Sequence, residues 1–164
     1  MKIVYLLTSL LLNSFPLHTW AESTTPQTPA VAQVSPFTEI SFIEGQSNLD
    51  PFARQSLDQV VRDANARGTI DEVQVISWGD ANAGASAEQI QLARNRAREV
   101  ENYLASRGNA LTIRTYNMVE KPSALRDLMN SSDARMRYSL SAAGLVPGSR
   151  RNAKATVLVI MRAN

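Results

Sequence analysis

The sequence has 164 residues, 44% of them hydrophobic and 6% aromatic, which is enough for one modest domain with a real core. Its 17 Lys and Arg residues nearly balance 15 Asp and Glu residues. This balance argues against a nucleic-acid binder, in which basic charge is concentrated. There is no cysteine and a single histidine, His18, so disulfides and thiolate metal sites are excluded. We therefore expect no metal site and no cofactor.

Residues 1–21 have the pattern of a secretory signal peptide. Lys2 supplies one positive charge, residues 3–12 are almost wholly apolar, and Thr19-Trp20-Ala21 is a small-x-small cleavage site. The apolar run is shorter than the roughly 20 residues that span a bilayer. The pattern predicts cleavage, export to the periplasm and no membrane span in the exported chain, so that any outer-membrane association would come through partners. An uncleaved anchor or a buried helix is the alternative.

Cleavage would also remove His18, and without histidine or cysteine the exported chain has no means of building a Ser-His-Asp triad. We therefore predict a non-catalytic protein. Residues 22–36 follow the signal and are rich in proline and threonine without any periodicity. This composition is typical of a flexible linker.

From residue 37 onward, strand and helix patterns alternate. Residues 38–42 alternate apolar and polar side chains, as does a second run at 72–76, and both predict half-buried strands. Asp50 followed by Pro51 predicts the start of a helix, which ends near Arg67 because Gly68 follows.

The second half of the domain continues this alternation. Ser86, with Gln89 three positions later, predicts the start of a helix that runs to Gly108, and residues 111–116 form a third strand pattern. Residues 122–144 are less regularly helical, with a break near 131–132, and the apolar run 155–161 predicts a central strand. The order β-α-β-α-β-α-β over residues 37–164 predicts an α/β fold, a two-layer sandwich with helices packed on a mixed four-stranded sheet.

Asp80 and Arg96 are the residues most suited to a binding site. Asp80 comes just after the second predicted strand, where ligands commonly bind in α/β sheets. Arg96 falls on the border of the apolar face of the next helix, so its stem can pack on the core while its head faces a cleft. From spacing alone two alternatives stay open: Asp80 could cap a turn, and Arg96 could pair with Glu99.

The sequence resembles the OmpA-like C-terminal domain, a peptidoglycan-binding family. The resemblance is carried by Phe42-x-x-Gly45-x-Ser47-x-Leu49-x-Pro51, by Asp80, by Leu92-Ala93-Arg94-Asn95-Arg96-Ala97 and by Asn152-Ala153-Lys154. It spans roughly residues 37–161, and the segment in the second helix is its most specific part.

The resemblance implies a periplasmic module that binds the free amino-acid end of diaminopimelate in the peptidoglycan stem peptide. That end is a zwitterion, so Asp80 would receive its ammonium group and Arg96 its carboxylate. No bond is broken, which implies binding rather than catalysis. The ligand-binding residues implied in this way are Asp80, Arg96, Gln89, Leu92, Asn152 and Lys154.

The sequence also departs from the family pattern. Trp78-Gly79 stands where the family has His/Tyr-Thr before the aspartate, Glu88-Gln89 replaces Tyr-Asn, and Ala153 replaces the first arginine of Asn-Arg-Arg. Residues 122–144 form a longer helical region than usual. These departures favour an alternative function, in which a degenerate OmpA-like domain is a protein-interaction subunit of an envelope or secretion assembly. The sequence leaves a homodimer open.

Overall fold

The computed structural model describes residues 35–80, 85–107, 111–149 and 151–162. The predicted signal peptide, residues 1–21, and all but the last two residues of the predicted linker lie outside these ranges. The elements follow the predicted order, with the last helical region divided into two short helices. They are β1 (Phe37–Ser41), α1 (Pro51–Arg67), β2 (Ile70–Ser77), α2 (Ala87–Ser106), β3 (Ile113–Asn117), α3 (Ala124–Met129), α4 (Ala134–Ala142) and β4 (Lys154–Met161).

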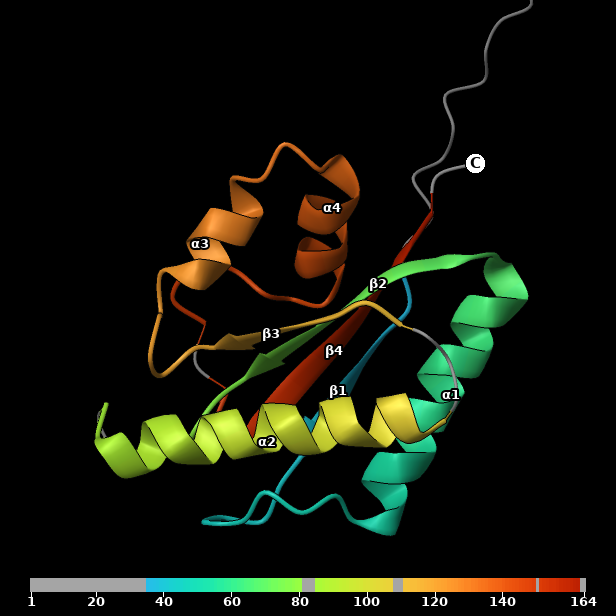
Figure 1. Cartoon of the computed structure of the whole chain (residues 1–164). Helices are drawn as coiled ribbons and strands as arrows, with labels where there is room; N and C mark the ends of the chain where they lie inside the picture. The colour runs from blue at the N-terminus through green and yellow to red at the C-terminus, as the bar shows by residue number, and fades with distance from the viewer. Residues whose placement is uncertain (1–34, 81–84, 108–110, 150, 163–164) are drawn as a thin grey trace, which may run out of the picture. The chain divides into compact units, whose positions relative to one another are not determined.

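The four strands form one mixed sheet in the order β1-β4-β2-β3 (Figure 1). β2 and β3 run parallel, whereas β4 runs antiparallel to both of its neighbours, β1 and β2. β4 occupies an interior position because residues 155–160 are all buried and so need cover on both faces. The predicted mixed four-stranded sheet and the central place of the last strand are confirmed.

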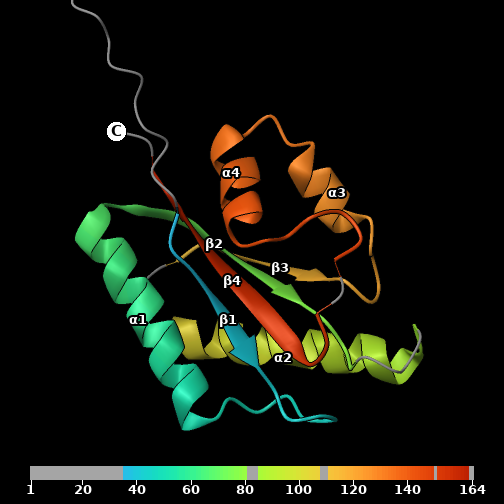
Figure 2. The same ribbon diagram turned by 180° about the vertical axis from the view of Figure 1, so that it is seen from behind.

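Helices cover both faces of this sheet (Figures 1 and 2). α1 and α2 pack on the face that carries Val157 and Val159, and α3 and α4 pack on the face that carries Leu158 and Ile160. The α/β class is confirmed, but the structure has three layers where two were predicted. Because β4 is apolar on both faces, the sheet requires the α3–α4 layer as well as the α1–α2 layer.

The helix boundaries follow the signals in the sequence. The side chain of Asp50 accepts a hydrogen bond from the amide of Ala53 at 2.6 Å and so caps α1. The hydroxyl of Ser86 accepts one from the amide of Gln89 at 3.3 Å and caps α2. α2 ends at Ser106, and the predicted end at Gly108 lies outside the described residues. The predicted break near 131–132 is confirmed, because α3 ends at 129 and α4 begins at 134. Among the described residues, no helix is both long and apolar enough to cross a membrane.

Candidate functional site

Asp80 and Arg96 form a buried ion pair at the end of β2. Nη2 of Arg96 lies 2.7 Å from Oδ1 of Asp80, and the side chains are 0% and 10% exposed respectively. The hydroxyl of Ser77, the last residue of β2, donates a hydrogen bond to the carbonyl of Ala93 in α2 at 2.9 Å. This bond fixes the end of β2 against α2, so Asp80 is held within reach of Arg96.

Arg96 also binds the loop between β1 and α1. Its Nε donates to the carbonyl of Gln46 at 2.9 Å, and Nη2 donates to the carbonyl of Ile43 at 3.3 Å. Nη1 donates to the carbonyl of Trp78 at 3.0 Å. With the bond to Asp80, four of the five N–H groups of the guanidinium have partners. The arginine head therefore lies beneath the loop, buried, rather than facing an open cleft as the sequence predicted.

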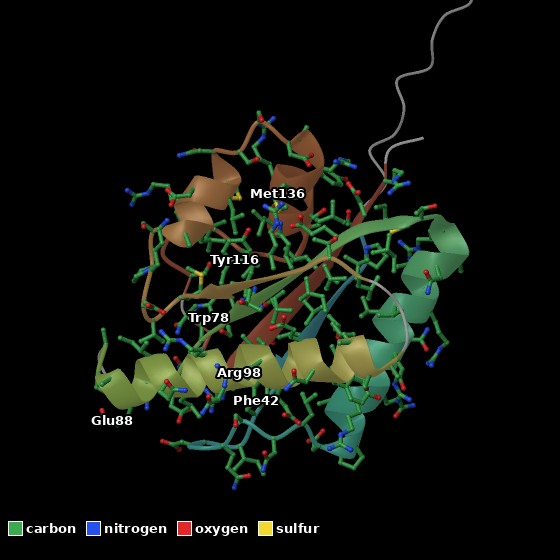
Figure 3. The ribbon with its side chains drawn as sticks, in the orientation of Figure 1. Phe42, Trp78, Glu88, Arg98, Tyr116 and Met136 are labelled. Atoms are coloured by element: carbon green, nitrogen blue, oxygen red, sulfur yellow. The ribbon has the colours of Figure 1, made fainter. Side chains whose placement is uncertain are left out.

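An aromatic ring completes the surroundings of the guanidinium. The Cζ atom of Arg96 lies 5.2 Å from the centroid of the Phe42 ring, and Figure 3 shows Phe42 on the α1–α2 side of the sheet. A cation over a ring is worth about 2 kcal/mol when both are desolvated. The charge of Arg96 is thus stabilised by a carboxylate, three carbonyl groups and a ring.

Asp80 is hydrogen-bonded to the β1–α1 loop and to α2. Its Oδ2 accepts a hydrogen bond from the amide of Gly45 at 2.8 Å, and its own amide donates to Oε1 of Gln89 at 2.7 Å. Gly45 has a φ of +71°, a left-handed conformation that glycine adopts without strain. A carboxylate offers about four lone-pair positions, so the bonds that the Asp80 carboxylate accepts from Gly45 and Arg96 leave acceptor capacity for a ligand.

Gly79 allows Gln89 to approach Asp80. A Cβ atom at position 79 would collide with Oε1 of Gln89 and would lie 3.2 Å from a methyl group of Val119. Because glycine has no Cβ, the amide oxygen of Gln89 can reach the backbone of Asp80. Gln89, one of the predicted ligand residues, therefore lies next to Asp80.

The other predicted ligand residues lie at different places. Leu92 is half-buried on α2, one turn before Arg96. Asn152 is exposed in the turn before β4, and its neighbour Ala153 donates its amide to the carbonyl of Gly79 at 2.8 Å. Asn152 thus stands in a turn bonded to the residue before Asp80, although within the described ranges it makes no hydrogen bond to Asp80 or Arg96.

Lys154 is directed to the opposite face of the sheet. Its ammonium group pairs with Glu39 of β1, and Arg151 pairs with the same carboxylate. Arg151 also donates to the carbonyl of Ala143 at the end of α4 at 2.9 Å, which places this trio on the α3–α4 side. Burial acts to raise the pKa of Glu39, but the hydrogen bonds from Lys154 and Arg151 outweigh it and lower that pKa. The structure therefore does not bring Lys154 to Asp80.

Trp78 is a core residue of the α3–α4 side. It is 6% exposed, packs in the same cluster as Leu145, and its Nε1 donates to the carbonyl of Ser149 at 3.3 Å. Its indole is therefore part of the core and is not available to a ligand. The described residues contain no group of three His, Cys, Asp or Glu side chains placed to hold a metal ion.

Sequence reasoning did not identify the part played by the β1–α1 loop. The loop contributes the amide of Gly45 to Asp80 and the carbonyls of Ile43 and Gln46 to Arg96. Backbone groups leave no pattern in the sequence, so Gly45 was the one residue that could have indicated the role of this loop. These contacts span 35 to 53 positions in the sequence, which a local pattern does not reveal.

Comparison with solved structures finds similar folds at low sequence identity. The peptidoglycan-associated lipoprotein of Burkholderia pseudomallei is 12% identical over 81% of this chain and 97% of that chain, with a TM-score of 0.48. The OmpA-like domain of FopA1 from Francisella tularensis is 14% identical over 78% and 75%, with a TM-score of 0.43. The periplasmic domain of Helicobacter pylori MotB is 12% identical over 80% of each chain, with a TM-score of 0.45. A search of curated proteins finds no match.

A family model supplies the stronger comparison. Residues 41–121 match the OmpA family. This range contains Gly45, Asp80, Gln89 and Arg96, the residues that the structure gathers around the buried ion pair. Over residues 41–121 the chain is therefore a divergent member of the OmpA family.

Proposed function

We propose that this chain is a non-catalytic, periplasmic module that binds peptidoglycan through Asp80 and Arg96. Domains of the OmpA family generally bind peptidoglycan, and the matched range includes both residues. The observation that carries the proposal is the buried ion pair at 2.7 Å. Groups of the β1–α1 loop and of α2 surround the pair and fix its position, which an ordinary surface ion pair does not require.

The ligand would be the zwitterionic end of diaminopimelate in the stem peptide. Its ammonium group would bind the carboxylate of Asp80, which is 10% exposed and keeps free acceptor positions. Its carboxylate would be attracted by the positive charge of Arg96, which is buried behind Asp80, and would bind backbone amides in the first turn of α2. An uncharged mimic would offer no ammonium group to the open acceptor positions of Asp80, which makes the site selective.

The two residues would contribute in different ways. Arg96 is fully buried and bonded to three carbonyl groups, so it both holds the loop and supplies positive charge behind Asp80. Asp80 is the more accessible of the two. We therefore expect Asp80 to make the direct contact that dominates affinity, and Arg96 to fix the position of that contact.

The test is co-sedimentation of the purified chain with insoluble diaminopimelate-type peptidoglycan. Asp80→Asn removes the charge with little change in shape, and we expect about ten- to hundredfold weaker retention, because a hydrogen bond to a charged group is worth about 1.5–3 kcal/mol. Asp58→Asn is the matched control, since Asp58 also pairs with an arginine, Arg107, at 2.8 Å. It should be retained like the unchanged chain.

Lysine-type peptidoglycan, whose stem side chain lacks the terminal carboxylate, tests the ligand chemistry. We expect the unchanged chain to bind it much more weakly. Equal retention on both walls would reject the zwitterion as the ligand. Unchanged retention of Asp80→Asn would reject the assigned site, and no retention of the unchanged chain on either wall would reject the function.

The second candidate function is a protein-interaction subunit of an envelope or secretion assembly. The observation in its favour is the α3–α4 layer, which leaves Tyr138 46% exposed and Val146 54% exposed. Residues of this kind on an added layer are suited to partner contacts. Co-purification from native envelopes that depends on Tyr138 would support this candidate, and a Tyr138→Ser chain recovered with the same partners would count against it.

A further inference from the structure

β1 is an edge strand with an open side. Among the described strands it pairs only with β4. On either side of β1, the amide of Phe42 donates to the carbonyl of Ala153, just before β4, and the carbonyl of Pro36 accepts from the amide of Val159 in β4. In an antiparallel pair, bonded and non-bonded residues alternate. The amides and carbonyls of Phe37, Glu39 and Ser41 therefore point away from β4, and none of them has a partner among the described residues.

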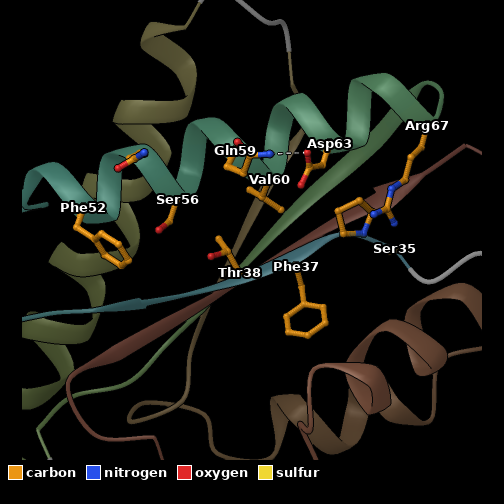
Figure 4. A pocket seen from close by; sticks show the side chains of 11 residues that line it. Ser35, Phe37, Thr38, Phe52, Ser56, Gln59, Val60, Asp63 and Arg67 are labelled. Carbon is orange, nitrogen blue, oxygen red and sulfur yellow. Dashed lines mark hydrogen bonds between the residues drawn. The ribbon is translucent and has the colours of Figure 1, made fainter.

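A groove lies along this open side. It has a volume of about 510 Å³ and is lined by the start of β1 and the outer face of α1. Figure 4 shows Phe52 and Val60 of α1 above the strand, with Thr38 directed toward them and Phe37 directed to the other face. Phe52 is 77% exposed and Phe37 is 42% exposed. An added strand next to β1 would have apolar contacts on both faces.

The charge on the α3–α4 side of this edge is unbalanced. Two cations, Arg151 and Lys154, share the carboxylate of Glu39 and pair with no other carboxylate among the described residues, so this trio has a surplus positive charge. All three side chains are partly exposed, at 25–38%. A residue opposite Glu39 on an added strand would point to the same face as this surplus, because facing residues in a sheet share a face.

We propose that the β1 edge binds an extended acidic segment of a partner protein, which adds a fifth strand to the sheet. The segment would bond to the outward groups of Phe37, Glu39 and Ser41 by strand addition. Its side chains opposite Thr38 and Ile40 would be apolar and enter the groove below α1. Its side chain opposite Glu39 would be acidic and meet Arg151 and Lys154. This site is separate from the proposed peptidoglycan site and does not depend on it.

A second copy of this chain suits the edge less well. Two β1 strands would pair antiparallel about a two-fold axis at Glu39, since only that register joins all six outward groups. The surplus positive charges of the two copies would then face each other across the axis. The charge pattern thus favours an acidic partner over self-association.

The test uses two synthetic peptides with blocked ends, one alternating valine with glutamate and one alternating valine with lysine. Hydrogen exchange of individual amides in the purified full chain is followed by NMR. We expect the glutamate peptide to slow exchange at Phe37, Glu39 and Ser41 by about tenfold or more, because bonded amides exchange only on opening. The lysine peptide should have little effect.

Ser41 provides the matched pair of variants. Proline at an outward position of an edge strand removes one exposed amide without breaking the ladder, so Ser41→Pro should weaken binding of the glutamate peptide at least about tenfold. Ser41→Ala keeps the amide and should bind like the unchanged chain. The same exchange data show whether each variant is folded.

Each other outcome would overturn the proposal. Slow exchange at these amides without peptide and at every protein concentration would mean that another segment of the chain covers the edge. Protection that rises with protein concentration would assign the edge to a second copy. Equal effects of the two peptides would refute the charge argument, and no effect of either would refute strand addition.

Discussion

Replacement of Asp80 by asparagine should destabilise the folded chain as well as weaken binding. The change leaves the guanidinium of Arg96, which is 0% exposed, without its anionic partner. Removing one member of a buried ion pair typically costs about 3–5 kcal/mol. Here three carbonyl groups and the Phe42 ring still stabilise the cation. We therefore expect a smaller loss of about 2–3 kcal/mol in the free energy of unfolding.

Replacement of Arg96 by methionine should cost more. Methionine keeps much of the packing, but the carbonyls of Ile43, Gln46 and Trp78 lose their donor. Leaving buried acceptors unsatisfied costs about 1–3 kcal/mol each, and water that enters at the loop would offset part of this. We expect a loss of about 3–5 kcal/mol. The double variant should lose less than the sum, with a coupling energy of about 1–3 kcal/mol.

Urea unfolding followed by the fluorescence of Trp78 measures these values. Trp78 is 6% exposed, and Trp20, the other tryptophan of the sequence, lies in the predicted signal peptide. Asp58→Asn, at a half-exposed pair, should cost under ~1 kcal/mol and serves as the control. Additive losses for the single and double variants, within about 0.5 kcal/mol, would show that Asp80 and Arg96 are not coupled and would refute the reasoning.

Three further predictions concern other parts of the fold. The pKa of Glu39 is lowered from its ordinary value of 4.5, with burial opposing and Lys154 favouring the charged form. Its contribution to stability is therefore present above pH 4.5 and is lost as the pH falls through the lowered pKa. Glu39→Gln should flatten this dependence of the free energy of unfolding on pH in urea titrations, and an unchanged dependence would contradict the prediction. Gly79→Ala should displace the Gln89 side chain, weaken peptidoglycan retention and lower the stability by about 1 kcal/mol. The double variant Gly79→Ala, Gln89→Ala should regain the stability. A further loss in the double variant would argue against a collision between residue 79 and Gln89. Leu140→Ala, at a 0% exposed position of α4, should cost about 2–5 kcal/mol in a single unfolding transition, whereas a separate early transition would mean that α3 and α4 unfold independently.

Much of the fold was predictable because its signals are local. Asp50-Pro51 and Gly68 mark the two ends of α1, and alternation or apolar runs mark the strands. The third layer could have been inferred from the last strand, since Val157 and Leu158 point to opposite faces and both are buried. The direction of Lys154 follows from the same alternation, because residues 154, 156 and 158 share a face.

The interior of the site was not predictable from spacing. Helix periodicity places Arg96 at the border of the apolar face, but it does not reveal that carbonyls from Ile43 and Gln46 cover the guanidinium. That burial depends on a loop 50 and 53 positions away in the sequence. The pairing of Asp80 with Arg96 needed the same tertiary information, and the spacing alone left a turn cap or a pair with Glu99 equally open.

The position of β4 has a consequence for how the chain reaches its folded state. β4 is the last of the described elements, yet it lies between β1 and β2 and contributes buried side chains to both helix layers. Until residues 154–161 are available, β1 has no strand to pair with, and neither layer can close over the sheet. A nascent chain must therefore include residues 154–161 before this sheet can form, and a chain cut before them would remain open to proteases.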